Sequence, residues 1–156
     1  MTSTFVKHYL TEKEANAVMD HVRGLDPYMV HYRTGPIKNR PKVEFGIPRA
    51  DGALPLYRFG QWKDDWTKVA VMPEWLVSIC KKLNTKYKQN LNHAIVMFCG
   101  EDYEIDDHQD KLTSISKTAD IFNLVPRFCF FHTLIYFFFF RVIQNYGLQK
   151  LQDIRI

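Results

Sequence analysis

The residues of this sequence that could do chemistry stand close together, at His108 and Asp110. One residue separates them, so on an extended backbone their side chains point to the same side. An imidazole and a carboxylate placed in this way can take two adjacent positions on one metal ion. A 2-His-1-carboxylate site also needs a second histidine from a distant strand, and it keeps positions open for a co-substrate and oxygen. The H-x-D spacing arises by chance as well, so the pattern alone leaves both a metal site and an ordinary loop open.

Charge is unevenly distributed along the chain, whose formal net charge is +4. The segment 101–110 holds six acidic residues and no lysine or arginine, which suits a hard cation. The segment 31–49 is basic, with Glu44 as its one acidic residue, and suits a polyanion such as nucleic acid. Two solvated loops of opposite sign would have the same composition. The basic residues of the second segment are Arg33, Lys38, Arg40, Lys42 and Arg49.

Length and composition indicate one globular domain. The chain has 156 residues, of which 46% are hydrophobic, enough to build a core. Its three cysteines are scattered and form no CxxC pair, which favours a reducing compartment over a disulfide framework. The N-terminal residues lack the apolar stretch of a signal peptide. We therefore expect an intracellular protein of the nucleus or cytoplasm.

Two helices are predicted. Thr11 and Glu14 have the spacing of a capping box at the start of a helix over residues 11–25, and Gly24 is its expected stop. A second helix is predicted to start at Pro73, because proline fits the first helical turn. The apolar face of this second helix would consist of Trp75, Leu76, Ile79, Cys80 and Leu83.

Short strands are predicted between and after these helices. The apolar runs 43–47 and 54–59 lie in a stretch rich in proline, glycine and aromatic residues. The runs 93–98 and 119–124 also have β character, and the acidic segment follows the first of them. Up to Leu124 the sequence therefore predicts an α+β protein.

The segment 91–111 resembles the motif of AlkB-like dioxygenases, which depend on iron(II) and 2-oxoglutarate. In that family an asparagine precedes an apolar strand, and a Gly/Asp-rich loop, an isoleucine or valine and H-x-D follow. The resemblance covers roughly residues 5–124, including 48–62, which is similar to the region that shapes the base-binding lid. The matching positions are Asn92, 94–98, 100–102, Ile105, His108 and Asp110, with Lys111 fitting a branch that reads H-x-D-K.

The resemblance implies a fold, a reaction and a set of site residues. The fold is a partial double-stranded β-helix (jelly roll), and the reaction is the oxidative dealkylation of nucleobases in alkylated DNA or RNA. The resemblance places Fe(II) on His108 and Asp110, and 2-oxoglutarate near Asn92 and Phe98. The family commonly has asparagine and tyrosine at the positions of Val96 and Phe98, so part of the contact with 2-oxoglutarate is lost here.

Nucleic acid is the partner that the resemblance implies, with a target base that is flipped out or single-stranded. The five basic residues of segment 31–49 could contact phosphates. Aromatic rings that follow them could stack on a base, or could equally pack in an ordinary core. These aromatic residues are Tyr57, Phe59 and Trp62.

The sequence changes character after Leu124. The thirteen residues 128–140 include seven phenylalanines and no charge, and they have neither of the periods that would give a helix or strand a polar side. The family would instead supply a distal iron histidine and an arginine pair that grips 2-oxoglutarate. His132 is the only histidine after Asp110, and its neighbours do not resemble the distal motif. We therefore expect a partial domain over residues 1–124, with little activity, and a foreign tail over 125–156.

The tail and the basic segment leave two other functions open. The tail is expected either to lack order or to form a helix on the open sheet, and it could drive self-association. A membrane-associated protein would use 128–140 as an anchor, although this run is shorter than the roughly 20 apolar residues of a span. A non-catalytic nucleic-acid-binding module would use the basic segment and the aromatic residues. No obligate protein partner is expected.

Overall fold

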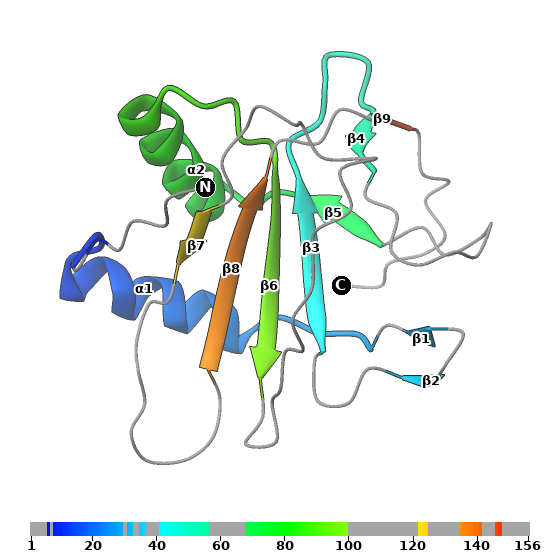
Figure 1. Ribbon diagram of the computed structural model, residues 1–156, viewed down its shortest axis with the longest axis horizontal. Coiled ribbons are helices and arrows are strands. Elements are labelled where there is room, and N and C mark those ends of the chain that lie inside the picture. The colour runs from blue at the N-terminus through cyan, green and yellow to red at the C-terminus, as the bar shows by residue number, and fades with distance from the viewer. Residues whose placement is uncertain are drawn as a thin grey trace.

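The chain folds into two layers, with helices on one face of a sheet, as a computed structural model shows (Figure 1). The structure describes residues 6, 8–29, 31–32, 35–36, 41–56, 68–99, 122–124, 135–141 and 146–147. The helices are α1 (Glu12–Arg23) and α2 (Glu74–Tyr87). The strands are β1 (His31–Tyr32), β2 (Gly35–Pro36), β3 (Lys42–Gly46), β4 (Leu54–Pro55), β5 (Val69–Val71), β6 (His93–Cys99), β7 (Phe122–Leu124), β8 (Ile135–Arg141) and β9 (Tyr146–Gly147).

Helix α1 begins and ends at the residues that the sequence predicts. The hydroxyl of Thr11 accepts a hydrogen bond from the backbone N–H of Glu14 at 3.2 Å, and the Glu14 carboxylate accepts one from the N–H of Thr11 at 2.9 Å. This reciprocal capping box satisfies two backbone donors that the helix itself leaves unpaired. Gly24 follows as the C-cap. The prediction of this helix is confirmed.

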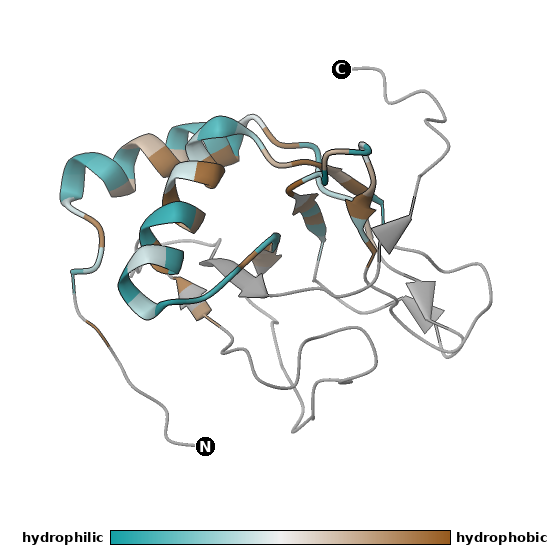
Figure 2. Ribbon diagram, turned by 90° about the horizontal axis from the view of Figure 1, so that it is seen from above, coloured by the Kyte–Doolittle hydropathy of each residue, from teal (hydrophilic) through white to brown (hydrophobic). Residues whose placement is uncertain are grey.

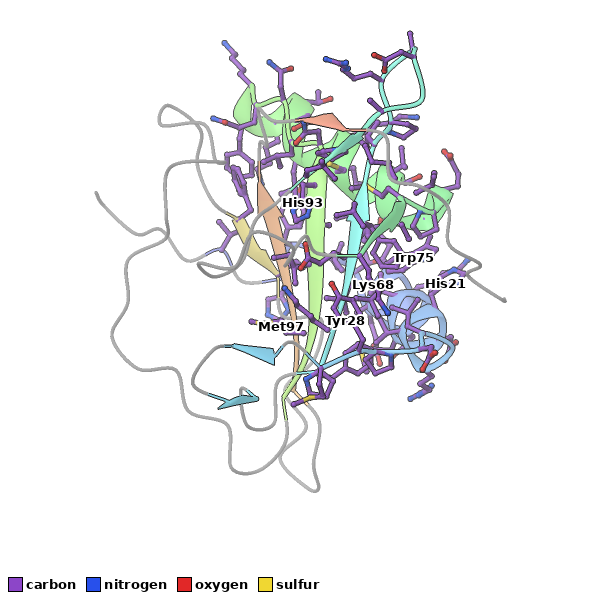
Figure 3. All side chains as sticks on the ribbon, turned by 90° about the vertical axis from the view of Figure 1, so that its right-hand side faces the viewer. His21, Tyr28, Lys68, Trp75, His93 and Met97 are labelled. Atoms are coloured by element: carbon purple, nitrogen blue, oxygen red, sulfur yellow. The ribbon has the colours of Figure 1, made fainter. Side chains whose placement is uncertain are left out.

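Helix α2 is confirmed as well, with Pro73 just before it as the N-cap. Its buried residues are Leu76, Ile79, Cys80 and Leu83, which recur every three or four residues and therefore share one face. Burial of each leucine or isoleucine contributes roughly 1.5–3 kcal/mol. The ring of Trp75 stacks on that of His21 in α1, with 5.2 Å between the centroids, so the two helices are also joined to each other (Figure 3).

The main sheet has the strand order β5-β3-β6-β8-β7. Strand β3 pairs parallel with β5 and antiparallel with β6, so these three strands already make a mixed sheet. Together with the two helices, this sheet confirms the predicted α+β class. The jelly roll is a finer expectation, and it stays a prediction.

The two faces of the sheet differ in polarity. Phe45 of β3 and Ala94, Val96 and Phe98 of β6 belong to the same buried cluster as the apolar faces of α1 and α2. Both helices lie on this side of the strands (Figure 2). Since successive side chains of a strand point to opposite faces, Lys42, Glu44 and His93 belong to the other face. The sheet thus has an apolar, helix-covered face and a second face with buried charge.

Residues 135–141 form strand β8, between β6 and β7 in the sheet (Figure 1). The register with β6 runs from His93 paired with Arg141 to Cys99 paired with Ile135. For these residues the expectation of a helix is wrong. A run of aromatic and β-branched residues favours a strand. Pairing with β6 along the whole of β8, and with β7 over Phe122–Leu124, supplies partners for its backbone polar groups. The proposed boundary at residue 125 stays a prediction.

No helix in the part of the chain that the structure describes is long and apolar enough to cross a membrane.

Candidate functional site

The predicted metal ligands, His108 and Asp110, lie outside the described residues. The strand that leads to them is present, because β6 covers the predicted run 93–98 and ends at Cys99. The convergence of the two ligands on one metal stays a prediction. Six of the predicted nucleic-acid contacts also lie outside the described residues, namely Arg33, Lys38, Arg40, Tyr57, Phe59 and Trp62.

Side chains of α2 hold the start of β6. The amide of Asn84 donates to the carbonyl oxygen of Leu91 at 3.1 Å and accepts from the N–H of Leu91 at 2.7 Å. The Cys80 thiol donates to the same carbonyl at 3.1 Å, and burial raises its pKa to about 12. The carbonyl of Asn92 accepts from the N–H of Ile47, just after β3, at 2.8 Å. These bonds fix where β6 starts.

The structure does not bring Asn92 and Phe98 together. Asn92 directly precedes β6 and Phe98 lies near its other end, so six residues at roughly 3.3 Å each separate them by about 20 Å. That distance exceeds the length of a five-carbon dicarboxylate, so one 2-oxoglutarate does not reach both side chains. Phe98 is 8% exposed and, with Val96, packs in the cluster that faces the helices. An apolar core explains why these two positions carry no amide or hydroxyl.

A buried polar cluster occupies the second face of the sheet. The Glu44 carboxylate binds the Lys42 ammonium through one oxygen, and His93 Nε2 lies 3.1 Å from the other oxygen. The Tyr28 hydroxyl reaches the first oxygen at 3.5 Å. Tyr28 and His93 are labelled in Figure 3. The side chains of Glu44 and His93 are 0% exposed. Three elements therefore meet at one carboxylate: β3, β6 and the segment that contains Tyr28.

The charges of this cluster stabilise an ionised Glu44. Burial raises the pKa of its carboxyl, but the charge of Lys42 and the hydrogen bond from His93 outweigh burial and lower the pKa to about 2. Since an ionised carboxylate only accepts hydrogen bonds, His93 Nε2 donates to it. Burial and the charge of Glu44 raise the pKa of Tyr28 above its ordinary value. The arrangement can hold β3 and β6 in register, and its lack of exposure leaves Glu44 no contact with a substrate in this state.

Sequence analysis missed this cluster. Lys42 and Glu44 are two residues apart on a predicted strand, so their shared face could have been inferred. Nothing in the sequence showed that His93 lies on the neighbouring strand, because strand pairing joins residues 49 positions apart.

Lys42 and Arg49 are the two predicted phosphate contacts that the structure describes. Lys42 is 3% exposed and bound to Glu44, so the expectation that it contacts phosphates is wrong for this structure. Its ammonium would first have to leave a buried carboxylate, which costs several kcal/mol. Arg49 lies on the surface, where its guanidinium binds Asp51 at 2.6 Å. That pair is solvated and weak, so Arg49 can exchange Asp51 for a phosphate.

Within the described residues, no group of three or more His, Cys, Asp and Glu side chains is placed to hold a metal ion. Comparison of the chain with protein-family models, with curated proteins and with solved structures gives no match.

Proposed function

We propose that this chain derives from an AlkB-like dioxygenase that dealkylates nucleobases of DNA or RNA with Fe(II) and 2-oxoglutarate. The observation that carries the proposal is the motif over residues 91–111. Its apolar strand lies within β6, and its acidic loop and H-x-D follow directly. The jelly roll belongs to the same proposal, with the main sheet as one of its two sheets.

In this proposal His108 and Asp110 hold the iron, which supplies oxygen activation when 2-oxoglutarate is bound. The protein's own part is to orient these ligands at the end of β6, which α2 anchors at its start through Asn84. Activity is impaired, since no third ligand matches the family and Val96 and Phe98 lack the polar groups for the co-substrate.

Anaerobic titration with Fe(II) tests the proposed ligands. The intact chain should bind iron weakly, and His108→Ala or Asp110→Asn should weaken binding by about tenfold or more, the effect expected from damage to a metal site. Asp106→Asn is the matched control, because it removes the same charge from the same loop, and it should leave the affinity within a factor of about two.

Equal losses in Asp110→Asn and Asp106→Asn would contradict the proposal, since they would indicate diffuse attraction by the acidic loop. Iron-dependent formation of succinate at a high rate would contradict the second part of the proposal, the impaired ligand set. In that case His132→Ala would show whether the tail supplies the missing ligand.

A non-catalytic nucleic-acid-binding module is the second candidate. The apolar surroundings of Val96 and Phe98 favour it, because they leave that part of β6 without groups to bind 2-oxoglutarate. This candidate predicts that the variant with both His108→Ala and Asp110→Ala binds oligonucleotides as tightly as the original chain. The opposite result would favour the dioxygenase: the variant binds oligonucleotides more weakly, and iron strengthens binding by the original chain but not by the variant.

A further inference from the structure

An open depression of about 510 Å³ lies on the helix layer, between α2 and the segment that precedes α1. Lysines and a tyrosine line it, although neither helix shows a nucleic-acid motif in its sequence. The lining residues are Tyr9, Lys81, Lys82, Thr85 and Lys86. These residues are distant in sequence from the basic segment 31–49.

The ammonium groups around this depression are held near aromatic rings and exposed carboxylates. Lys86 Nζ lies 4.9 Å from the ring centroid of Tyr9 and 5.4 Å from that of Tyr87. Lys82 binds Glu14, and Lys81 Nζ lies 3.9 Å from Glu74. Both ion pairs are solvated, with 71% of the Lys81 side chain and 54% of the Lys82 side chain exposed. Such pairs contribute little to stability, so these ammonium groups can exchange a carboxylate for a phosphate.

The fold of α2 does not require this concentration of positive charge. The helix buries its opposite face, through Leu76, Ile79, Cys80 and Leu83. Attraction to the helix dipole favours a cation in the last turn, which accounts for Lys86. Lys81 and Lys82 stand more than a turn before the helix ends at Tyr87, where the dipole has little effect.

The chemistry of the depression fits single-stranded nucleic acid better than a lipid surface. Interfacial helices insert apolar side chains into the membrane, and the outer face of α2 offers Ser78, Thr85 and the lysines instead. Grooves for single strands combine positive charge that follows the phosphates with aromatic rings on which bases stack. We propose that Lys81, Lys82 and Lys86 bind the phosphates of a single strand and that Tyr9 stacks on one of its bases.

This inference goes beyond the proposed dealkylation, because it concerns binding on the helix layer, which covers the apolar face of the sheet. It can be measured without iron or 2-oxoglutarate, so its failure is distinguishable from failure of the His108–Asp110 site. The probe is a short, unmodified, fluorescein-labelled single-stranded DNA, followed by fluorescence anisotropy with the full chain.

The variant for this test carries Lys81→Gln and Lys86→Gln. Near 0.1 M salt it should bind the strand roughly tenfold or more weakly, and the slope of log K against log salt should fall by about 1.4, since each phosphate contact contributes about 0.7. The control carries Lys13→Gln and Lys68→Gln, two exposed lysines elsewhere on the described surface, and should bind within a factor of about two of the original chain. Equal losses in both variants, or no loss in either, would overturn the proposal.

Substitutions of Tyr9 distinguish stacking on a base from general electrostatic attraction. Tyr9→Phe keeps the ring and should bind normally, whereas Tyr9→Leu should lose about fivefold or more, the fold-change that corresponds to one stacked base. Unchanged thermal melting of both variants would show that the fold is intact, and equal affinity of the two folded variants would overturn the stacking role. Vesicles with anionic lipids are the last arm of the test. The proposal would be overturned if the chain bound these vesicles more tightly than DNA and the lysine variant bound them more weakly. The surface would then be assigned to a membrane.

Discussion

The two faces of the sheet consist of side chains from the same strands, but one face is apolar and the other is polar. On β3 and β6, Phe45, Val96 and Phe98 join the apolar cluster under the helices, whereas Glu44 and His93 form a buried polar cluster on the other side. The apolar face contributes stability roughly in proportion to the area that it buries. The polar face gains little net free energy from burial, but it fixes one arrangement of the strands, because any shift leaves a buried charge without its partner.

The difference between the two faces also bears on the proposed AlkB-like motif. Val96 and Phe98, which lack the polar groups of the family, lie on the core side, where an amide or a hydroxyl would need a buried partner. The polar residues of β3 and β6 lie on the opposite side. Positions 96 and 98 therefore face the core and not a co-substrate.

The largest expected effect concerns the charge balance of the polar face. Glu44→Gln leaves the Lys42 ammonium buried without an anion and should lower the free energy of unfolding by about 3 to 5 kcal/mol. Denaturant titration measures this value. Leu76→Ala calibrates the apolar face, with an expected loss of about 2 to 5 kcal/mol. A loss below about 1 kcal/mol for Glu44→Gln would mean that water reaches the cluster and that the two faces differ less than the structure indicates.

The polar side chains of β3 and β6 can also be replaced together. A variant with Lys42→Met, Glu44→Leu and His93→Leu removes the three polar side chains that β3 and β6 contribute, and the Tyr28 hydroxyl keeps its backbone hydrogen bond with Lys68. This variant should be as stable as the original chain or more stable. The difference in free energy of unfolding between this triple variant and Glu44→Gln measures the cost of leaving the buried Lys42 ammonium unpaired. If the triple variant were the less stable of the two, the polar cluster would itself be a net source of stability.

The pH dependence of stability should differ between the two faces. The pKa of Glu44 is about 2 in the folded chain against an ordinary 4.5, so the folded state binds fewer protons in this range. The stability that Glu44 contributes is therefore complete above about pH 4.5 and is lost as the pH falls toward 2. Denaturant titrations across this range should show that loss.

The triple variant supplies the control for this acid effect, because it lacks Glu44 and should lose less stability over the same range. Glu14 has its pKa lowered to about 2 as well, by Lys82 and Thr11, so Glu14→Gln is included to subtract its share. Identical pH profiles for the original chain and the triple variant would show that Glu44 is not ionised in the way described.

A smaller effect is expected at the anchor of β6. Asn84→Ala leaves the N–H and the carbonyl of Leu91 without their side-chain partner and should cost about 1 to 3 kcal/mol. Asn90→Ala, in the same connection between α2 and β6, serves as the exposed control. Amide hydrogen exchange at Leu91 gives a local reading, and unchanged protection there would contradict the role assigned to Asn84.

The predictions that the structure confirms rest on local patterns in the sequence. The capping box predicted α1, and proline with the apolar spacing predicted α2, since both patterns act within one or two turns of a helix. The run 93–98 predicted β6. Strand pairing depends on residues far apart, so the sequence did not show that Glu44 meets His93, and the charge of Lys42 suggested a surface position that pairing with Glu44 removes. For residues 135–141 the expectation was a packed helix, because a helix satisfies its own backbone hydrogen bonds, whereas pairing with β6 and β7 does so in a strand.

The proposed iron site at the end of β6 can be located with Mn(II) as a paramagnetic stand-in for Fe(II) and NMR of the labelled chain. We expect Mn(II) to broaden the amide signals of Phe98, Cys99 and the acidic segment 101–110, while those of Lys81 to Lys86 stay sharp. The broadening should disappear in the variant with His108→Ala and Asp110→Ala. Broadening that persists in that variant, or that centres on Glu44 and His93, would show that His108 and Asp110 do not hold the metal.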